Sequence, residues 1–356
     1  MPITQAYDFL IQWHFTERCN LRCRHCYQDG LKVEEMPLAE ILPVIGAITE
    51  MVRAWEEAYG IEFSPSFNVT GGEPFLRADF FTILQELGKT GFEIFILSNG
   101  TLITPEIARR VADLGVKGVQ VSLEGPEEIH ETIRGKGSYA AALKGVGQLL
   151  EAGVTVSLNT TLSRFNAPYF MDLVEVARSL GAPRLGFSRL VPSGRGLSML
   201  DQMLPVDEVK ELYEKFLALK IEGLKITCGD PLAAQMTAPR EAEDEGAIPL
   251  GGCAAGVSGC TILADGAITP CRRLPIPVGN VRRDNLREIW ATAPVFAALR
   301  DRSRYRGKCG RCARWANCRG CRAIAYACSL ARGKPDFLAD DPQCFMDNCV
   351  GGGPGT

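Results

Sequence analysis

Three cysteines near the N-terminus have a spacing that can bind iron. Cys19, Cys23 and Cys26 form a Cys-x3-Cys-x2-Cys loop. Three thiolates can hold three irons of a four-iron, four-sulfur cluster and leave the fourth iron open to another ligand. A structural zinc site normally has four protein ligands, and His25 is the candidate for the fourth. The loop therefore predicts a catalytic iron–sulfur cluster, with a zinc loop as the alternative.

A second group of cysteines lies in the C-terminal part of the chain. Of the fourteen cysteines, eleven follow from Cys228 onward, and none lies between Cys26 and Cys228. A zinc ribbon with nucleic-acid affinity is one interpretation. The favoured one is two further four-iron clusters with four ligands each, held by Cys253, Cys260, Cys271, Cys309, Cys312, Cys318, Cys321 and Cys344. Cys228, Cys328 and Cys349 receive no role, because buried free thiols are common and inert.

The composition narrows the classes of protein that fit. With 356 residues, 46% of them hydrophobic and a net charge of −3, the chain has ordinary globular composition. This charge predicts neither nucleic-acid binding nor attachment to a membrane, and no run of about 18 apolar residues is present to span one. The N-terminus lacks the basic and apolar regions of a signal peptide. We therefore expect a cytoplasmic protein, in which cysteines bind metal more often than they form disulfides.

Three short polar segments follow apolar runs and have residue types that suit a binding site. They are Gly71-Gly72-Glu73-Pro74, Ser98-Asn99-Gly100 and Ser122-Leu123-Glu124-Gly125. Glycines let the backbone approach a ligand closely, and Glu73 can accept a charge-assisted hydrogen bond. Taken singly, each segment has an alternative reading as a turn or a solvated carboxylate. Their order, one at each strand end, indicates one shared site.

Strand and helix patterns alternate between the two cysteine regions. The predicted strands are Phe9–Phe15, Phe67–Thr70, Phe92–Ser98, Gly118–Leu123, Val154–Thr161 and Arg184–Leu190. The predicted helices are Pro37–Tyr59, Asp79–Lys89, Pro105–Leu114, Ser138–Glu151, Ala167–Leu180 and Val206–Lys220. Six such repeats predict a parallel sheet, closed or nearly closed into a barrel, with functional groups at the carboxyl ends of its strands. An open doubly wound sheet fits less well, since no Gly-x-Gly-x-x-Gly follows the first strand.

The same pattern divides the chain into three parts. Residues 1–222 form the barrel, residues 223–252 a linker, and residues 253–356 a small cysteine-rich domain. The linker is predicted because Pro231, Pro239, Pro249 and the acidic run Glu241–Glu245 interrupt any regular pattern. The last part has little apolar periodicity, so we expect it to need metal to fold.

The cysteine loop, followed by Tyr27, resembles the signature of the radical S-adenosylmethionine (SAM) superfamily. The resemblance implies an α/β fold with a partial (β/α)6, TIM-like barrel that holds a [4Fe–4S] cluster and SAM. In the family, the segment that matches Gly71–Pro74 binds the methionyl ammonium of SAM, and Arg134 is the expected partner of its carboxylate. The full set of SAM-binding residues implied in this way is Tyr27, Gly71, Gly72, Glu73, Pro74, Ser98, Asn99, Ser122, Glu124, Arg134, Asn159, Thr161 and Val191.

The C-terminal cysteines resemble those of the SPASM domain, which follows the barrel in radical SAM peptide maturases and their relatives. The resemblance assigns a first auxiliary cluster to Cys253, Cys260, Cys271 and Cys321, and a second to Cys309, Cys312, Cys318 and Cys344. Three [4Fe–4S] clusters are therefore expected in all. One departure concerns the last spacer, where only Arg319 and Gly320 precede Cys321 and family members often have three residues. This departure puts the ligand role of Cys321 in question.

The resemblance implies an enzyme that cleaves SAM reductively to a 5′-deoxyadenosyl radical and takes a hydrogen atom from a substrate. A peptide or protein side chain is the substrate expected first. Because the barrel begins by residue 9, a leader peptide is expected to need a separate recognition partner. A tetrapyrrole is the alternative, since Cys321-Arg-Ala through Cys344 also resembles enzymes of alternative haem synthesis. A flavodoxin- or ferredoxin-type donor is expected to supply the electron, and an electron carrier without catalysis leaves the SAM-type motifs unexplained.

Overall fold

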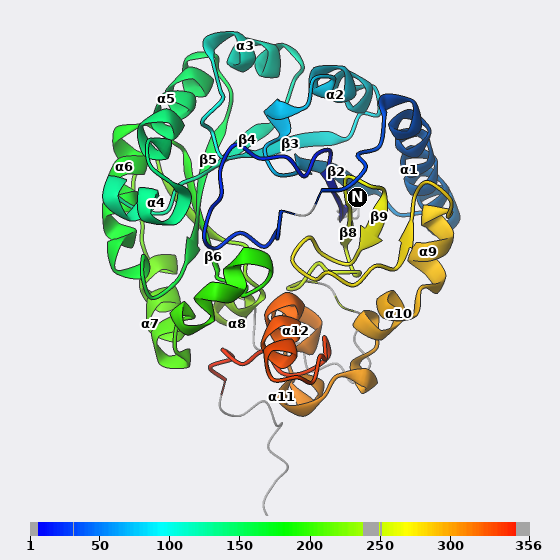
Figure 1. Ribbon diagram of the computed structural model, residues 1–356. Helices are drawn as coiled ribbons and strands as arrows, with labels where there is room; N and C mark the ends of the chain where they lie inside the picture. Colours follow the sequence, from blue (N-terminus) through cyan, green and yellow to red (C-terminus); the bar gives the residue numbers. More distant parts are fainter. Residues whose placement is uncertain (1–5, 31, 238–248, 250, 347–356) are drawn as a thin grey trace, which may run out of the picture.

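Ten strands form one sheet that curves around an open interior (Figure 1). The computed structural model describes residues 6–30, 32–237, 249 and 251–346. The strand order within these residues is β10-β9-β8-β1-β2-β3-β4-β5-β6-β7, which is open at both ends. Every pair from β8 through β7 is parallel, whereas β9 pairs antiparallel with β8 and β10. The fold is therefore an α/β fold with a partial parallel barrel and an attached cysteine-rich region.

The elements follow one another as the sequence pattern predicts over most of the barrel. The strands are β1 (Tyr7–His14), β2 (Phe63–Thr70), β3 (Glu93–Ser98), β4 (Gly118–Ser122), β5 (Val156–Leu162), β6 (Arg184–Arg189), β7 (Lys225–Cys228), β8 (Gly259–Ile262), β9 (Ala267–Thr269) and β10 (Gly279–Asn280). The barrel helices are α1 (Leu38–Tyr59), α2 (Phe80–Gly88), α3 (Pro105–Asp113), α4 (Glu127–Arg134), α5 (Ser138–Glu151), α6 (Phe170–Ser179) and α7 (Val206–Leu217). The later helices are α8 (Ala234–Thr237), α9 (Leu286–Thr292), α10 (Pro294–Arg300), α11 (Gly307–Arg311) and α12 (Arg322–Ala331).

Two barrel elements differ from the prediction. β2 begins at Phe63 and not at Phe67. Its first half was not predicted, because Pro65 in the sequence argues against a strand. Pairing with β3 starts only at Ser66, so the missing N–H of Pro65 leaves that ladder intact. The short helix α4 was not predicted, since its two turns follow directly on a polar strand end.

Part of the range 223–252 is structured, which corrects its prediction as a linker. β7 pairs in parallel with β6 and extends the barrel sheet. Pro231 opens a 3-10 helix, where its missing N–H is no loss, and the side chain of Asp230 caps that helix by accepting from the Leu232 N–H at 2.9 Å. Pro239 and Glu241–Glu245, on which the linker prediction also relied, lie outside the described residues.

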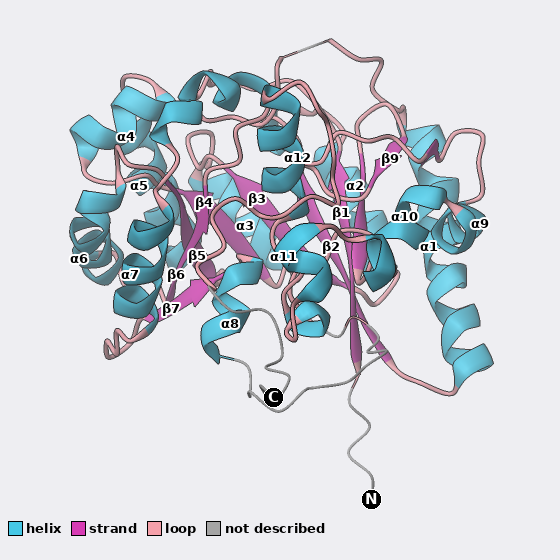
Figure 2. Ribbon diagram, turned by 90° about the horizontal axis from the view of Figure 1, so that it is seen from below, coloured by secondary structure: helices cyan, strands magenta, loops and turns pink. Residues whose placement is uncertain are grey.

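The outer face of the sheet is covered by helices and forms the main apolar core. Phe9 of β1 packs edge-on against Trp55 of α1 and Trp290 of α9, with ring centroids 5.1 and 5.0 Å apart. The two tryptophans are themselves 6.0 Å apart, and α9 lies beside α1 in both views (Figures 1 and 2). The C-terminal region thus shares the core of the barrel. None of the helices in the described ranges is long and apolar enough to cross a membrane.

Strand β8 joins the C-terminal region to the barrel through backbone hydrogen bonding. It pairs in parallel with β1 over four residues, with Leu10 opposite Gly259 and Ile11 opposite Cys260. A side chain at Gly259 would lie 2.3 Å from the Leu10 carbonyl oxygen, so glycine permits this close approach. Strands of the barrel and of the cysteine-rich region consequently belong to one continuous sheet.

Candidate active site

The three-cysteine loop lies at the carboxyl end of β1 and crosses the open end of the barrel (Figure 1). Backbone hydrogen bonds hold it on both sides. The Arg24 N–H donates to the Ile133 carbonyl of α4, and the Gly196 N–H donates to the Cys26 carbonyl, both at 2.9 Å. The loop is therefore fixed between α4 and the segment that follows β6.

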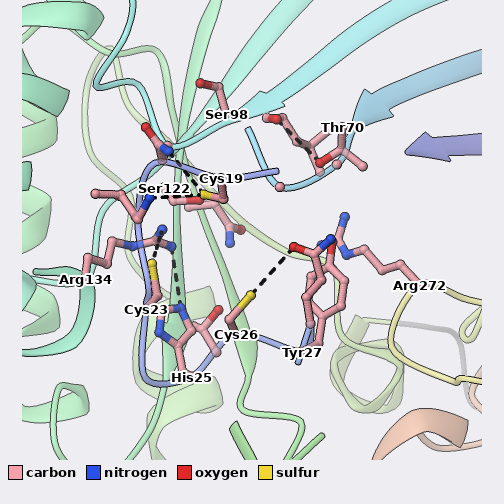
Figure 3. A pocket seen from close by; sticks show the side chains of 18 of the residues that line it. Cys19, Cys23, His25, Cys26, Tyr27, Thr70, Ser98, Ser122, Arg134 and Arg272 are labelled. Carbon is pink, nitrogen blue, oxygen red and sulfur yellow. Dashed lines mark hydrogen bonds between the residues drawn. The ribbon is translucent and has the colours of Figure 1, made fainter. Parts of the chain in front are cut away.

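A cavity opens beneath this loop, and the three cysteines line it together (Figure 3). Ten of the thirteen residues predicted to bind SAM also line it: Tyr27, Gly71, Gly72, Ser98, Asn99, Ser122, Arg134, Asn159, Thr161 and Val191. Eight of them come from the carboxyl ends of β2 to β6, as the barrel prediction requires, whereas Tyr27 belongs to the cysteine loop and Arg134 to α4. The other three, Glu73, Pro74 and Glu124, lie behind the cavity wall with their side chains buried.

The thiols suit an iron–sulfur cluster better than a zinc ion. Burial raises the pKa of Cys19 to about 11, so a thiolate there needs a bound metal cation of either kind, and the arrangement of the ligands has to distinguish the two. In the described part of the chain, no three His, Cys, Asp or Glu side chains converge closely enough to hold one metal ion. Cluster thiolates are spread over several irons and need not converge. His25, the candidate fourth zinc ligand, lies 3.3 Å from the Glu124 carboxylate.

Gly71 and Gly72 bring the end of β2 against the start of the cysteine loop. The Gly72 N–H donates to the Thr16 carbonyl and the Glu73 N–H to the Arg18 carbonyl, both at 2.8 Å. A side chain at Gly72 would lie 2.2 Å from the Arg18 carbonyl oxygen. The two glycines are therefore required by backbone packing under the loop, and they also form part of the cavity wall.

Glu73 fixes the turn after β3 from behind the cavity wall. Its carboxylate accepts from the Ser98 hydroxyl at 2.9 Å and from the Asn99 N–H at 2.8 Å, and its side chain is fully buried. Burial raises the pKa of Glu73 to about 7, although these hydrogen bonds act in the opposite direction. Pro74 follows as the first residue of a 3-10 helix. Glu73 thus acts on the cavity through Ser98 and Asn99.

Glu124 and Arg134 form a buried ion pair at the edge of the cavity. Arg134 Nε donates to Glu124 Oε1 at 2.9 Å, and Thr160 Oγ1 and the Thr161 N–H donate to Oε2 at 3.1 and 2.9 Å. Burial alone would raise the pKa of Glu124, but Arg134 and His25 outweigh it and lower that pKa. The Arg134 guanidinium also lies 3.7 Å from Cys23 Sγ. Arg134 therefore faces the cysteine loop, and Glu124 holds it in place.

Several cavity residues were not predicted from the sequence: Gln28, Thr70, Gln120, Ser188, Arg195, Arg272 and Arg273. Gln120 and Ser188 face inward because strand side chains alternate, and Gln120 lies two residues before Ser122. That alternation was a usable signal for both. Arg272 and Arg273 come from the C-terminal region, which was expected to cap or flank the open rim of the barrel, but no residue pattern marked these two arginines.

A second small cavity is lined by all four cysteines assigned to the second auxiliary cluster. Its empty volume is about 280 Å³, and its cysteines are Cys309, Cys312, Cys318 and Cys344. Gln235 Nε2 donates to Cys318 Sγ at 3.2 Å, and Arg322 Nη2 donates to Cys309 Sγ at 3.4 Å. Burial raises the pKa of Cys318 to about 12. Three buried thiols and one half-buried thiol, with polar donors and no competing acid among the lining residues, are a fitting donor set for a cluster.

The four cysteines assigned to the first auxiliary cluster are not brought together in the same way. Cys271 and Cys321 belong to one apolar cluster beside α12, whereas Cys260 belongs to the main core. Cys260 of β8 lies opposite Ile11 of β1. Opposite residues of paired parallel strands point to the same face of the sheet, and Ile11 points to the face that the helices cover. Burial raises the pKa of Cys260 to about 12, and Arg300 acts in the opposite direction. By its register the Cys260 thiol faces the helices that cover the sheet.

The short spacer before Cys321 makes a sharp turn. Arg319 and Gly320 both adopt left-handed backbone conformations, with φ of 61° and 60°. Arg319 is held there by its guanidinium, which donates to the carbonyls of Ala316 at 2.7 Å and Cys253 at 2.8 Å. Two residues in this conformation reverse the chain, so that α12 starts directly after the turn.

A partial parallel barrel that carries a three-cysteine loop at its carboxyl end defines a class of enzymes that bind an iron–sulfur cluster with an open iron. Comparison with family models agrees. Residues 13–177 match the radical SAM superfamily, and residues 253–322 match the SPASM iron–sulfur cluster-binding domain. The chain belongs to the radical SAM superfamily and has a C-terminal SPASM domain; it is a radical SAM enzyme.

Individual relatives cover nearly the whole chain. An AdoMet-dependent heme synthase of Methanosarcina barkeri is 34% identical over 94% of this chain and 96% of its own. A mycofactocin maturase of Mycobacterium ulcerans is 29% identical over 94% and 87%. Among solved structures, Streptococcus suis SuiB bound to its precursor peptide SuiA superposes with a TM-score of 0.75 at 16% identity, over 96% of this chain and 77% of that one. The last likeness shows the fold alone.

Proposed function

We propose that this protein is a radical SAM enzyme whose substrate is a tetrapyrrole. The observation that carries this proposal is the full-length similarity, at 34% identity, to a protein named AdoMet-dependent heme synthase. Two further proteins of that name are 31% identical over 94% of the chain. This order reverses the expectation from sequence, which placed a peptide or protein side chain first. The peptide is the second candidate, supported by the 29% identity to a mycofactocin maturase, and it would bring a separate leader-binding partner.

The cavity residues position the reactants. When bound, the reduced cluster would supply one electron to the sulfonium of SAM, whose C5′–S bond would break to give methionine and a 5′-deoxyadenosyl radical able to take a hydrogen atom from the substrate. Cys19, Cys23 and Cys26 would hold three irons and leave the fourth for SAM. Arg134, fixed by Glu124, would bind the SAM carboxylate. The strand ends would hold SAM in one orientation and keep water away from it.

We further propose one auxiliary cluster, on Cys309, Cys312, Cys318 and Cys344. The shared cavity of these four thiols supports it. The resemblance to SPASM domains implies another cluster on Cys253, Cys260, Cys271 and Cys321, and the strand register that turns Cys260 toward the covering helices argues against it. The auxiliary cluster would accept the electron that remains on the oxidised substrate. A flavodoxin- or ferredoxin-type protein would reduce the first cluster.

The test is a substrate comparison under anaerobic conditions. Reconstituted full-length protein is incubated with dithionite, SAM and iron coproporphyrin III, and 5′-deoxyadenosine and porphyrin species are followed by mass spectrometry. We expect 5′-deoxyadenosine above the rate without porphyrin, together with a new porphyrin species. The triple variant Cys19→Ala, Cys23→Ala, Cys26→Ala should form neither product. If the porphyrin neither stimulates SAM cleavage nor changes in mass, the tetrapyrrole proposal is wrong.

A further inference from the structure

A tight turn of the SPASM domain brings two arginines to the SAM cavity. The turn spans Cys271–Leu274, and the Leu274 N–H donates to the Cys271 carbonyl at 2.9 Å. Arg272 and Arg273 are its two central residues, and both line the cavity. Leu274 is fully buried in the apolar cluster that includes Ile324 of α12. Helix α12 therefore anchors the turn and fixes the direction of the two arginines.

Arg272 and Arg134 enter the cavity from opposite sides, with the cysteine loop between them (Figure 3). Arg134 is paired with Glu124 on the α4 side. The Arg272 guanidinium lies over the ring of Tyr27, 5.6 Å from its centroid. The cavity thus has two separate cationic positions, one contributed by the barrel and one by the SPASM domain.

The two arginines of the turn lack an acidic partner in the described residues. Neither forms an ion pair there, and Nε of Arg273 is buried without a hydrogen-bond partner. Asp230 is the carboxylate that acts on Arg273, but both of its oxygens already accept hydrogen bonds from Arg189. No aspartate or glutamate lines the described part of the cavity. Two adjacent, partly buried cations without a counter-charge are unfavourable unless an anion binds them.

From this arrangement we infer that Arg272 and Arg273 bind a carboxylate of the substrate. This inference deepens the proposed function and rests on it, since the side chains of a coproporphyrin end in carboxylates. Arginine suits this task because its planar guanidinium binds a carboxylate through two parallel hydrogen bonds. The SPASM domain would then select the substrate as well as carry a cluster.

A competing role is that the arginines neutralise cluster thiolates. Arg273 makes a side-chain hydrogen bond to Cys271 and lies near Cys321. Arg272 lies instead on the ring of Tyr27, on the cavity side of the turn. A role in cluster binding would therefore appear in Arg273 variants as lost iron, and a role in substrate binding would appear in Arg272 variants with iron unchanged.

The test is an equilibrium titration of reconstituted, SAM-loaded full-length protein with iron coproporphyrin III, followed by the visible absorption of the porphyrin. Arg272→Gln and Arg273→Gln should each weaken binding by about tenfold to hundredfold, the effect of one lost charge-assisted pair. Arg272→Lys should fall between, because an ammonium keeps the charge and loses the fork. The exposed Arg283 pairs with Asp284 outside the cavity, so Arg283→Gln is the matched control and should bind as the unaltered protein does.

The tetramethyl ester of the same porphyrin completes the test. It lacks the carboxylates, so its affinity should be equal in the unaltered protein and in the two glutamine variants. Iron content and melting temperature confirm that each variant is folded. The inference is overturned if the variants bind the acid as tightly as the unaltered protein, or if SAM affinity falls as far as porphyrin affinity. If the unaltered protein binds no porphyrin at all, the proposed function falls first and this inference falls with it.

Discussion

The carboxylate of Glu73 accepts a 2.8 Å hydrogen bond from the backbone N–H of Asn99, although the two residues are 26 positions apart in the chain. The Asn99 side chain in turn lies 3.9 Å from Cys19 Sγ and donates to Asn20 at 2.9 Å. Glu73 is thus linked through one turn to the first cysteine of the cluster loop. A residue behind the cavity wall can therefore control both the turn after β3 and the loop.

Replacing Glu73 should weaken SAM binding. Glu73→Ala leaves the Ser98 hydroxyl and the Asn99 N–H unpaired in a buried position, which costs about 1.5–3 kcal/mol, so that the turn shifts to regain partners. Since SAM binding would have to restore the turn at that cost, we expect affinity to fall by up to roughly 150-fold. Glu73→Gln keeps one acceptor oxygen and should fall between. Calorimetric titration of SAM measures both. Glu34→Ala, at an exposed position just past the loop, is the control, whereas Glu35 is unsuitable because it contacts Thr16 and Arg18. Unchanged affinity in Glu73→Ala would show that the turn needs no such support.

Gly72→Ala should disrupt the contact between β2 and the cysteine loop. The new methyl group would lie 2.2 Å from the Arg18 carbonyl oxygen and 2.5 Å from its carbon, and neither backbone atom can move without shifting the loop. We expect SAM binding to fall more than in Glu73→Ala, with a lower melting temperature. Gly147→Ala is a matched control, because that residue is in α5 with open space around it and alanine favours helix by about 1 kcal/mol. Wild-type SAM affinity in Gly72→Ala would contradict the packing argument.

Iron analysis should distinguish two clusters from three. From the position of Cys260 we expect about eight irons per chain after anaerobic reconstitution, and not the twelve that the sequence resemblance implies. Cys312→Ala should reduce the content to about four, and so should the triple variant of the N-terminal cysteines. Cys260→Ala should leave it at eight. A parent value near twelve, with loss of about four irons in Cys260→Ala, would establish the auxiliary cluster on Cys253, Cys260, Cys271 and Cys321.

Arg189 should be essential for stability where the barrel meets the C-terminal segment. Its guanidinium donates to Asp230 at 2.8 and 3.0 Å and to Asp341 at 2.9 and 2.7 Å, and all three side chains are buried. Arg189→Ala leaves two buried carboxylates without a cation, which costs about 3–5 kcal/mol and lowers the melting temperature by on the order of 10 °C. Arg189→Lys should recover little, since one ammonium cannot serve both acids. Arg178→Ala, which removes an exposed pair with Glu175, should change the melting temperature by no more than about 2 °C.

Most of the barrel could be predicted from sequence, because each element carries its own signal. Helix α5 has both predicted bounds, Ser138 and Glu151, since an amphipathic stretch lies between Gly137 and Gly153. β7 was missed because four residues in a proline-rich range give too little periodicity to recognise. The pairing of β8 with β1 could not be predicted either. It depends on which chain segment reaches the open sheet edge, and no local pattern records that.

In the candidate site, too, features with a local sequence signal were predicted and features without one were not. The cysteine loop and the strand ends were predicted because residue type and order carry the information, and the structure brings ten of the expected SAM residues to one cavity. The direction of individual side chains was not predictable. Glu73 turns behind the wall and Cys260 turns into the core because of turn geometry and strand register. Arg272 reaches the cavity from a segment more than two hundred residues after the loop.

The parallel pairing of β8 with β1 bears on how this protein can be divided. Cutting the chain ahead of the SPASM domain would strip β1 of one partner and expose Phe9, Ile11 and Trp13, now buried, beside a row of free N–H and C=O groups. An unprotected apolar edge of this kind invites association between chains. A barrel expressed alone would therefore tend to aggregate. Exchange of SPASM domains between relatives would have to carry β8 and a compatible β1 together.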